Sequence, residues 1–233
     1  MNGNASLALA TLAFVGTHFA MSHPLRPALL ARFGERGFSI LYSLVSFATL
    51  GWMILAWRAI DVAEPLYIAP LWWWDVVSPV MLFALMLLFA SFARNPAFPH
   101  PGAEPKPIRP ATGAFAITRH PMNWSFAIWA LVHISVFGSP RNLIVAAGIL
   151  ILAIGGSVGQ DRRKAALLGE HWREWQERTS FVPFAGLFGG KASLKALLPL
   201  WLPLVLAVPA WIAILYWHAP LVWPISLAYA PMG

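Results

Sequence analysis

This chain lacks cysteine altogether and has few charged residues, which make up 11% of its sequence. The absence of cysteine excludes disulfides, thiolate nucleophiles, iron–sulfur clusters and cysteine-bound zinc. Because 59% of the residues are hydrophobic, the scarcity of charge also excludes an ordinary soluble domain. A net charge of +7 would suit a nucleic-acid partner, but no soluble basic segment carries it. We therefore expect a polytopic membrane protein that is surrounded by membrane lipid and does not bind nucleic acid.

The long apolar runs predict an all-α polytopic helix bundle with about six transmembrane helices, forming a single domain over residues 1–233. The uncharged end, Ala219–Gly233, contains three prolines and leaves a seventh membrane segment open. The six runs are Ser6–Leu25, Gly37–Trp57, Trp74–Ala93, Thr118–Phe137, Asn142–Gly159 and Leu194–Trp217.

Lysine and arginine fall almost entirely in alternate connections, the pattern of loops that stay in the cytoplasm. Only Arg58 and Arg141 lie on the opposite side. This asymmetry predicts a multi-pass protein whose two termini both face the periplasm. The fourteen basic residues assigned to the cytoplasmic side are Arg26, Arg32, Arg36, Arg94, Lys106, Arg109, Arg119, Arg162, Arg163, Lys164, Arg173, Arg178, Lys191 and Lys195.

The cytoplasmic connection after the fifth run, Gln160–Phe184, predicts an amphipathic helix at the membrane surface. Its large apolar side chains fall on one side of a helix and its charges on the other. The apolar residues are Leu167, Leu168, Trp172 and Trp175.

Two histidines, His18 and His133, lie inside apolar runs, where an ionisable side chain is costly without a partner. A hydrogen bond to another helix and a cofactor ligand are both compatible with this placement. His23 and His120 stand at the ends of the same runs. At 100° per residue the two histidines of each run point in nearly opposite directions, so one helix cannot aim both at the same atom.

Depth favours a pairing of His18 with His133. Measured from the cytoplasmic boundary at 1.5 Å per residue, His18 lies about 13 Å and His133 about 20 Å inside, a difference that helix tilt can absorb. The axial nitrogens of a bis-histidine haem must approach one iron, and these two histidines are the pair nearest in height.

The cytoplasmic mouth is the predicted second tier of the cofactor site. It comprises His23, Arg26, Arg119 and His120, where arginines would bind propionates or another anion. Plain positive-inside charge is the alternative reading of these arginines.

Four segments in the same order resemble the NnrU family of bacterial inner-membrane proteins, over about residues 1–185. They are FVGTHFAMSHPLRP, ARFGERGFSILYSLVSFATL, ITRHPMNWSFAIWALVH and DRRKAALLGEHWREWQERTSFVPF. The resemblance implies an inner-membrane location and, from the family's gene context, a setting in denitrification and nitric oxide metabolism. Residues 186–233, the C-terminal span and tail, lie beyond it.

That family is related to plant 15-cis-zeta-carotene isomerase, a membrane protein with haem b held by two histidines. Carried over by motif, the predicted metal ligands of haem b are His133 and, on the first helix, His18, with His23 as the fallback. The resemblance thus implies a redox, isomerase-like or nitric-oxide-linked role on a lipophilic or gaseous molecule. The isomerase has a cysteine three residues before its second histidine, whereas this chain has Ala130, which weakens a redox-linked ligand switch.

Two alternatives stay open, and with them the question of whether the protein is an enzyme. The Arg-His-Pro block and the following tail also resemble the isoprenylcysteine and phospholipid methyltransferases, which bind S-adenosylmethionine. The corresponding residues are Arg119, His120 and Asp161, although Asp161 is followed by Arg162 in place of paired acids. The second alternative is a non-enzymatic accessory protein with a respiratory-complex partner.

Overall fold

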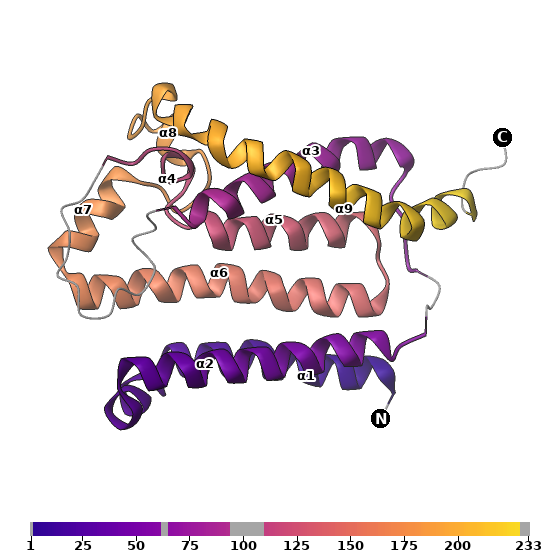
Figure 1. The fold of residues 1–233 in the computed structure, drawn as a ribbon, viewed down its shortest axis with the longest axis horizontal. Coiled ribbons are helices and arrows are strands. Elements are labelled where there is room, and N and C mark those ends of the chain that lie inside the picture. Colours follow the sequence, from indigo (N-terminus) through magenta and orange to yellow (C-terminus); the bar gives the residue numbers. More distant parts are fainter. Residues whose placement is uncertain (1, 62–64, 94–109, 229–233) are drawn as a thin grey trace. The chain divides into compact units, whose positions relative to one another are not determined.

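A computed structural model describes residues 2–61, 65–93 and 110–228, with side chains up to His218. The described residues are mainly helical, which confirms the all-α prediction (Figure 1). Their only β-type pairing is an isolated bridge between Ile68 and Phe137.

Five helical stretches in the described part of the chain are long and apolar enough to cross a membrane. They are α1 (Gly3–Ser22), α2 (Arg26–Arg58), α3 (Leu71–Ser91), α6 (Pro140–Leu168) and the stretch Leu194–His218, which joins the 3₁₀ helix η1 (Leu194–Leu200) to α9 (Trp201–Ala228). The chain is therefore a polytopic membrane protein, as expected.

The remaining predicted span, Thr118–Phe137, contains a shorter helix, α5 (Pro121–Val136). Thr118 is extended, with ψ of 150°. His120 precedes Pro121, and a residue before a proline is disfavoured in a helix, so α5 starts only at Pro121. Its 16 residues reach about 24 Å, less than the full hydrocarbon thickness.

The connection between α1 and α2 is more helical than the sequence suggested. α1 ends at Ser22, close to Pro24, and α2 starts at Arg26, so three predicted loop arginines lie on a helix. Gly34 interrupts α2 with φ of 65° and ψ of 178°, a conformation that is essentially restricted to glycine.

The predicted amphipathic helix starts later than expected. α6 continues to Leu168 and ends at Gly169, whose φ is 54°, so Leu167 belongs to α6 and is 68% exposed. The amphipathic helix proper is α7 (Glu170–Arg178), which buries Trp172 and Trp175 and exposes charged residues.

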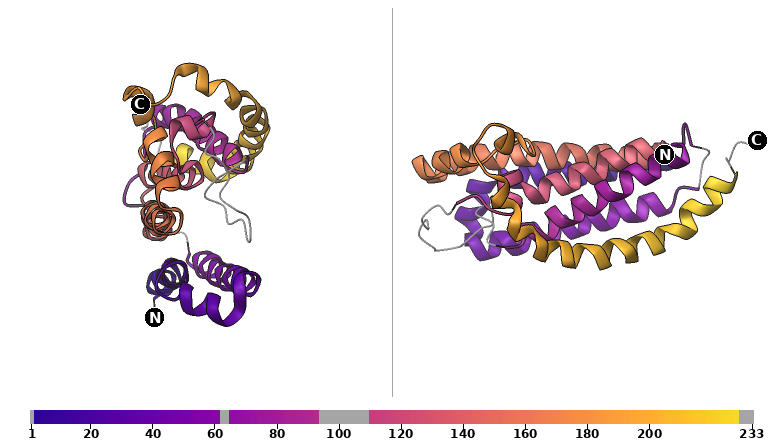
Figure 2. Two further views of the ribbon diagram at one scale, coloured as in Figure 1. Left: turned by 90° about the vertical axis from the view of Figure 1, so that its left-hand side faces the viewer. Right: turned by 90° about the horizontal axis from the view of Figure 1, so that it is seen from above.

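α9 continues through Ala228, so the part of the uncharged end up to that residue extends this helix and forms no separate segment. The helix curves along its length (Figure 2). Pro203 and Pro209 lie inside it, and each removes a backbone donor, which bends a helix.

The chain divides into two compact units. Of the described residues, the first comprises 2–61, 65–68 and 129–170, and the second comprises 69–93, 110–128 and 171–228. The expectation of a single domain stays a prediction.

In the first unit, α1 packs against both α2 and α6. Its core centres on Leu7, Ala10 and Phe14 of α1 with Met53 and Ala56 of α2. α6 approaches α1 through glycines, because Gly148 meets Thr11, Gly155 meets Phe19 and Gly159 meets His23.

In the second unit, α3 packs against α9, and the Trp211 indole donates to the Ser78 carbonyl at 3.0 Å. Met86, Leu87, Ile117 and Ala207 contribute to its core. Two short helices, α4 (Ala114–Ile117) and α8 (Ala185–Phe188), pack against each other beside it.

Candidate functional site

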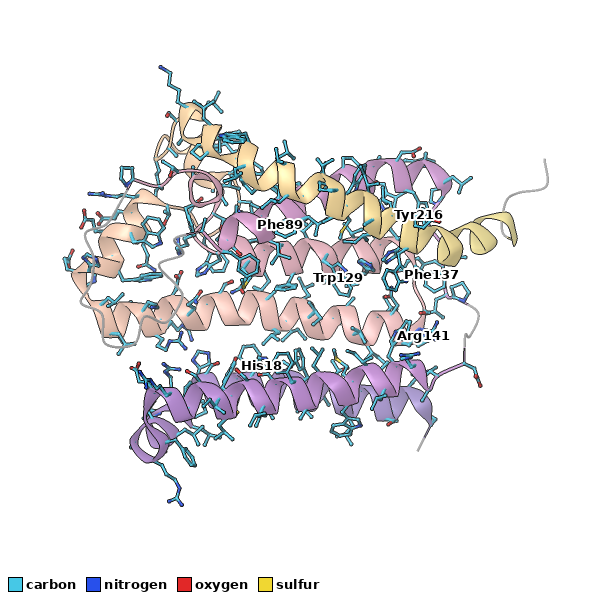
Figure 3. All side chains as sticks on the ribbon, viewed as in Figure 1. His18, Phe89, Trp129, Phe137, Arg141 and Tyr216 are labelled. Carbon is cyan, nitrogen blue, oxygen red and sulfur yellow. The ribbon has the colours of Figure 1, made fainter. Side chains whose placement is uncertain are left out.

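His18 occupies an aromatic setting on α1. Its ring centroid lies 4.4 Å from that of Phe14 and 5.4 Å from that of Tyr42 on α2, the latter edge-on. The ring is partly buried, and Figure 3 shows it on the side of α1 toward α6. Its Nδ1 lies 2.7 Å from the Phe14 carbonyl oxygen. Since that oxygen can only accept, Nδ1 carries the proton and Nε2 of the neutral ring carries the lone pair.

His133 has a similar setting on α5. Its Nδ1 lies 2.8 Å from the Trp129 carbonyl oxygen, and its ring centroid is 4.1 Å from that of Trp129. The Asn142 side chain donates to the carbonyls of His133 at 2.9 Å and Phe137 at 2.6 Å. Asn142 therefore fixes the helix end that carries His133.

The two predicted ligands thus share one tautomer and belong to the same compact unit. Neutral imidazole with Nδ1 bonded to a carbonyl is the form in which histidine usually binds a metal through Nε2. Across the described residues, no three His, Asp or Glu side chains gather as a metal cluster. A haem held by two axial histidines needs no such cluster.

His23 and Arg26 lie at the turn between α1 and α2. The His23 ring is packed against the Gly159 backbone of α6 and stacks on Phe19 with centroids 6.3 Å apart. Burial lowers the pKa of His23, and the positive charge of Arg163 lowers this pKa further. The Arg26 guanidinium lies 4.6 Å from the centroid of the Phe38 ring.

Arg119 and His120 belong to the second unit, whereas the other four predicted site residues belong to the first. His120 is only 3% exposed and lies edge-on to Phe181 at 5.3 Å, and the Arg119 guanidinium covers the same ring at 5.4 Å. The grouping of Arg119 and His120 with His23 and Arg26 at one mouth stays a prediction.

Hydrogen bonds fix the segment that carries His120. The Thr118 hydroxyl and the Trp124 indole both donate to the Phe181 carbonyl, at 2.7 and 2.8 Å. The Arg119 backbone N–H donates to the Ser180 carbonyl at 2.9 Å. Two of the motif blocks in the sequence are therefore parts of one local structure.

Sequence reasoning missed Tyr42 and Asn142. Tyr42 touches His18 and accepts a hydrogen bond from the Ser22 hydroxyl at 3.3 Å. A phenol inside an apolar run needs a partner, which was the available signal. Asn142 carried no such signal, because polar residues are common at helix starts.

Comparisons with known proteins extend this description. A segment of 83 residues is 34% identical to 15-cis-zeta-carotene isomerase of Arabidopsis thaliana and 32% identical to that of Zea mays. The segment covers 36% of this chain and 23% of each relative, so the chain spans about a quarter of their length. No solved structure matches the chain significantly.

The family model described as NnrU protein matches residues 6–224. This match includes the six predicted site residues, His18, His23, Arg26, Arg119, His120 and His133. It confirms the resemblance read from the four sequence blocks and extends it beyond residue 185. The chain therefore belongs to the NnrU family.

Proposed function

We propose that this protein binds haem b through His18 and His133 and has a redox or isomerase-like role on a lipophilic or gaseous molecule. The observation that carries the proposal is the pair of bonds from Nδ1 to a helix carbonyl, made by His18 and His133, which belong to the same unit. When bound, haem b supplies a one-electron couple whose potential depends on its axial ligands.

The chain's own residues would orient the two ligands. The Phe14 and Trp129 carbonyls hold each ring in one tautomer, and Phe14, Tyr42 and Trp129 pack against the rings. Such packing restricts ring rotation and limits water access. Similarity to carotene isomerases supports an apolar substrate, while the substrate itself stays a proposal.

The test is the absorption spectrum of the purified full chain from a haem-sufficient host, with haem quantified as its pyridine haemochrome. We expect near-stoichiometric haem b, and loss of most haem in His18→Ala and His133→Ala. His218→Ala is the matched control, since His218 also has its Nδ1 2.9 Å from a helix carbonyl but is exposed and lies in the second unit.

Two results would decide the histidine assignment. If His23→Ala loses haem while His18→Ala keeps it, His23 is the ligand on the first helix. If both variants and His133→Ala keep their haem, the proposal is wrong.

A second candidate is a methyltransferase that uses S-adenosylmethionine, with Arg119 and His120 in the binding site. The burial of His120 beside Phe181 favours it, because a buried imidazole in a fixed segment is a reasonable binding group. Isothermal calorimetry with S-adenosylmethionine tests it, and the absence of heat that depends on His120 would reject it. The role as a respiratory accessory protein and the link to denitrification stay predictions.

A further inference from the structure

Three basic side chains of the first unit lie within electrostatic range of one another, where α1 ends, α2 begins and α6 nears its end. We call Arg26, Arg163 and Lys164 the basic cluster. The charge of Arg26 acts on both Arg163 and Lys164, and the charge of Arg163 acts on Lys164. All three side chains are partly buried. The fold therefore brings like charges together in a place where water screens them incompletely.

Helix packing explains this proximity independently of any charge. The His23 ring, at the end of α1, is packed against Gly159 of α6. Arg163 lies four residues further along α6, one turn away on the same face. Arg26 opens α2 three residues after His23. Close packing of α1 on α6 thus positions the basic cluster.

The charges of the basic cluster are not neutralised by the described protein. Among the residues that the structure describes, no carboxylate forms an ion pair with Arg26, Arg163 or Lys164. The Phe38 ring contacts Arg26 and stabilises a cation without cancelling its charge. Topology alone would be served equally well by fully exposed basic residues. Three partly buried cations without an ion pair among the described residues therefore favour an anionic ligand at this place.

Two further features favour an anion at this point. α2 begins here, so the positive end of its dipole adds to the charge of the cluster. The Tyr42 hydroxyl accepts from Ser22 and lies within electrostatic range of Arg163. A phenol hydroxyl can donate its own proton to an oxyanion.

We propose that the basic cluster binds an oxyanion, a phosphate or carboxylate carried by an amphiphile whose apolar part lies in the membrane. The headgroup of an acidic lipid and the acid group of a hydrophobic ligand share this chemistry. The site does not depend on haem, and it is tested on haem-free protein so that its failure is separate from that of the proposed function.

The lipid arm uses the full chain in phosphatidylcholine nanodiscs, with phosphatidylglycerol titrated in and bound lipid counted by native mass spectrometry. We expect the double variant Arg163→Gln/Lys164→Gln to bind phosphatidylglycerol about tenfold more weakly than the natural chain, because one or two charge-assisted hydrogen bonds are lost. The melting temperature of the natural chain rises with phosphatidylglycerol, and that of the variant does not.

The single variant Arg163→Gln should also weaken binding, and Arg162→Gln is its matched control, since it removes one charge from a neighbouring, exposed position of α6. If Arg162→Gln weakens binding as much as Arg163→Gln, attraction is diffuse and the site is wrong. Arg163→Lys keeps the positive charge and should retain most of the affinity for phosphatidylglycerol. Retained binding would show that substitution at this position does not itself unfold the protein.

The carboxylate arm compares palmitic acid with its methyl ester in neutral detergent. Stabilisation by the acid alone, lost in the double variant, identifies a carboxylate ligand. Stabilisation by phosphatidylglycerol alone identifies a lipid headgroup. If neither probe stabilises the natural chain more than the double variant, the proposal is overturned.

Discussion

At the scale of single residues, the contact of His23 with Gly159 sets how closely α1 approaches α6. A β-carbon at position 159 would lie 2.3 Å from His23 Nε2, closer than atoms can pack. Gly159→Ala should therefore destabilise the protein by about 1–3 kcal/mol. The measurement is the unfolding midpoint in detergent.

Two controls separate this clash from a general helix effect. Gly16→Ala in α1 meets nothing within 4 Å and should be neutral or slightly stabilising. Adding His23→Ala to Gly159→Ala should recover part of the loss. Additive effects of the two substitutions would show that the ring and the glycine are not in contact.

The titration of His23 belongs to the same scale. Burial and the charge of Arg163 lower the pKa of His23 in the folded protein below its ordinary value of 6.5. The folded state then binds fewer protons than the unfolded state, so stability is fully present above about pH 6.5 and falls as the pH drops below it. Unfolding midpoints of the natural chain and of His23→Gln between about pH 8 and about pH 5 test this. Equal slopes in both proteins would contradict it.

At the scale of helices, Gly34 determines how α2 turns after α1. Its backbone, with φ of 65° and ψ of 178°, is strained for any side chain, so Gly34→Ala should cost about 1–3 kcal/mol. Gly51→Ala lies inside the same helix with nothing within 4 Å and should be neutral or stabilising. The unfolding midpoints of both variants in detergent test this prediction. Equal midpoints would show that the backbone at Gly34 does not need the conformation that only glycine adopts.

Helices could be predicted from the sequence more reliably than their ends. Apolar runs of about 20 residues determine spans, so α1, α3 and α9 lie near their expected positions. α6 continues past its charged residues because arginine, lysine and alanine favour helix, and only Gly169 ends it.

The candidate site could be predicted residue by residue but not as an arrangement. His18 and His133 stood out because ionisable groups are rare in apolar runs. The contact of Tyr42 with His18 and the bond from Asn142 to the His133 carbonyl depend on which helices pack together. Helix periodicity does not contain that information.

At the scale of the whole molecule, α5 decides the topology. Five crossings would put the two termini on opposite sides of the membrane, while a sixth crossing by α5 puts them on the same side. The distribution of lysine and arginine predicts the second arrangement. We therefore expect α5 to cross despite its length, with local thinning of the bilayer.

The absence of cysteine makes this prediction easy to test, because each introduced cysteine is the only thiol in the chain. A membrane-impermeant maleimide added to intact cells should label Asp61→Cys, whose position is exposed. Ser193→Cys should be labelled only after the membrane is opened. If Asp61→Cys and Ser193→Cys are both labelled in intact cells, the two positions lie on one side of the membrane and α5 does not cross it.

The two ends of the first unit are fastened unequally. At one end Arg141 lies 4.4 Å from the centroid of the Trp57 ring and donates to the Ile60 carbonyl at 2.9 Å, which joins the start of α6 to the end of α2 (Figure 3). At the other end like charges repel. We therefore expect α6 to separate from α1 and α2 first at the end that carries the basic cluster, while Arg141 holds the other end together. Backbone amides near Gly159 should exchange their hydrogens faster than those near Asn142, most of all at low ionic strength.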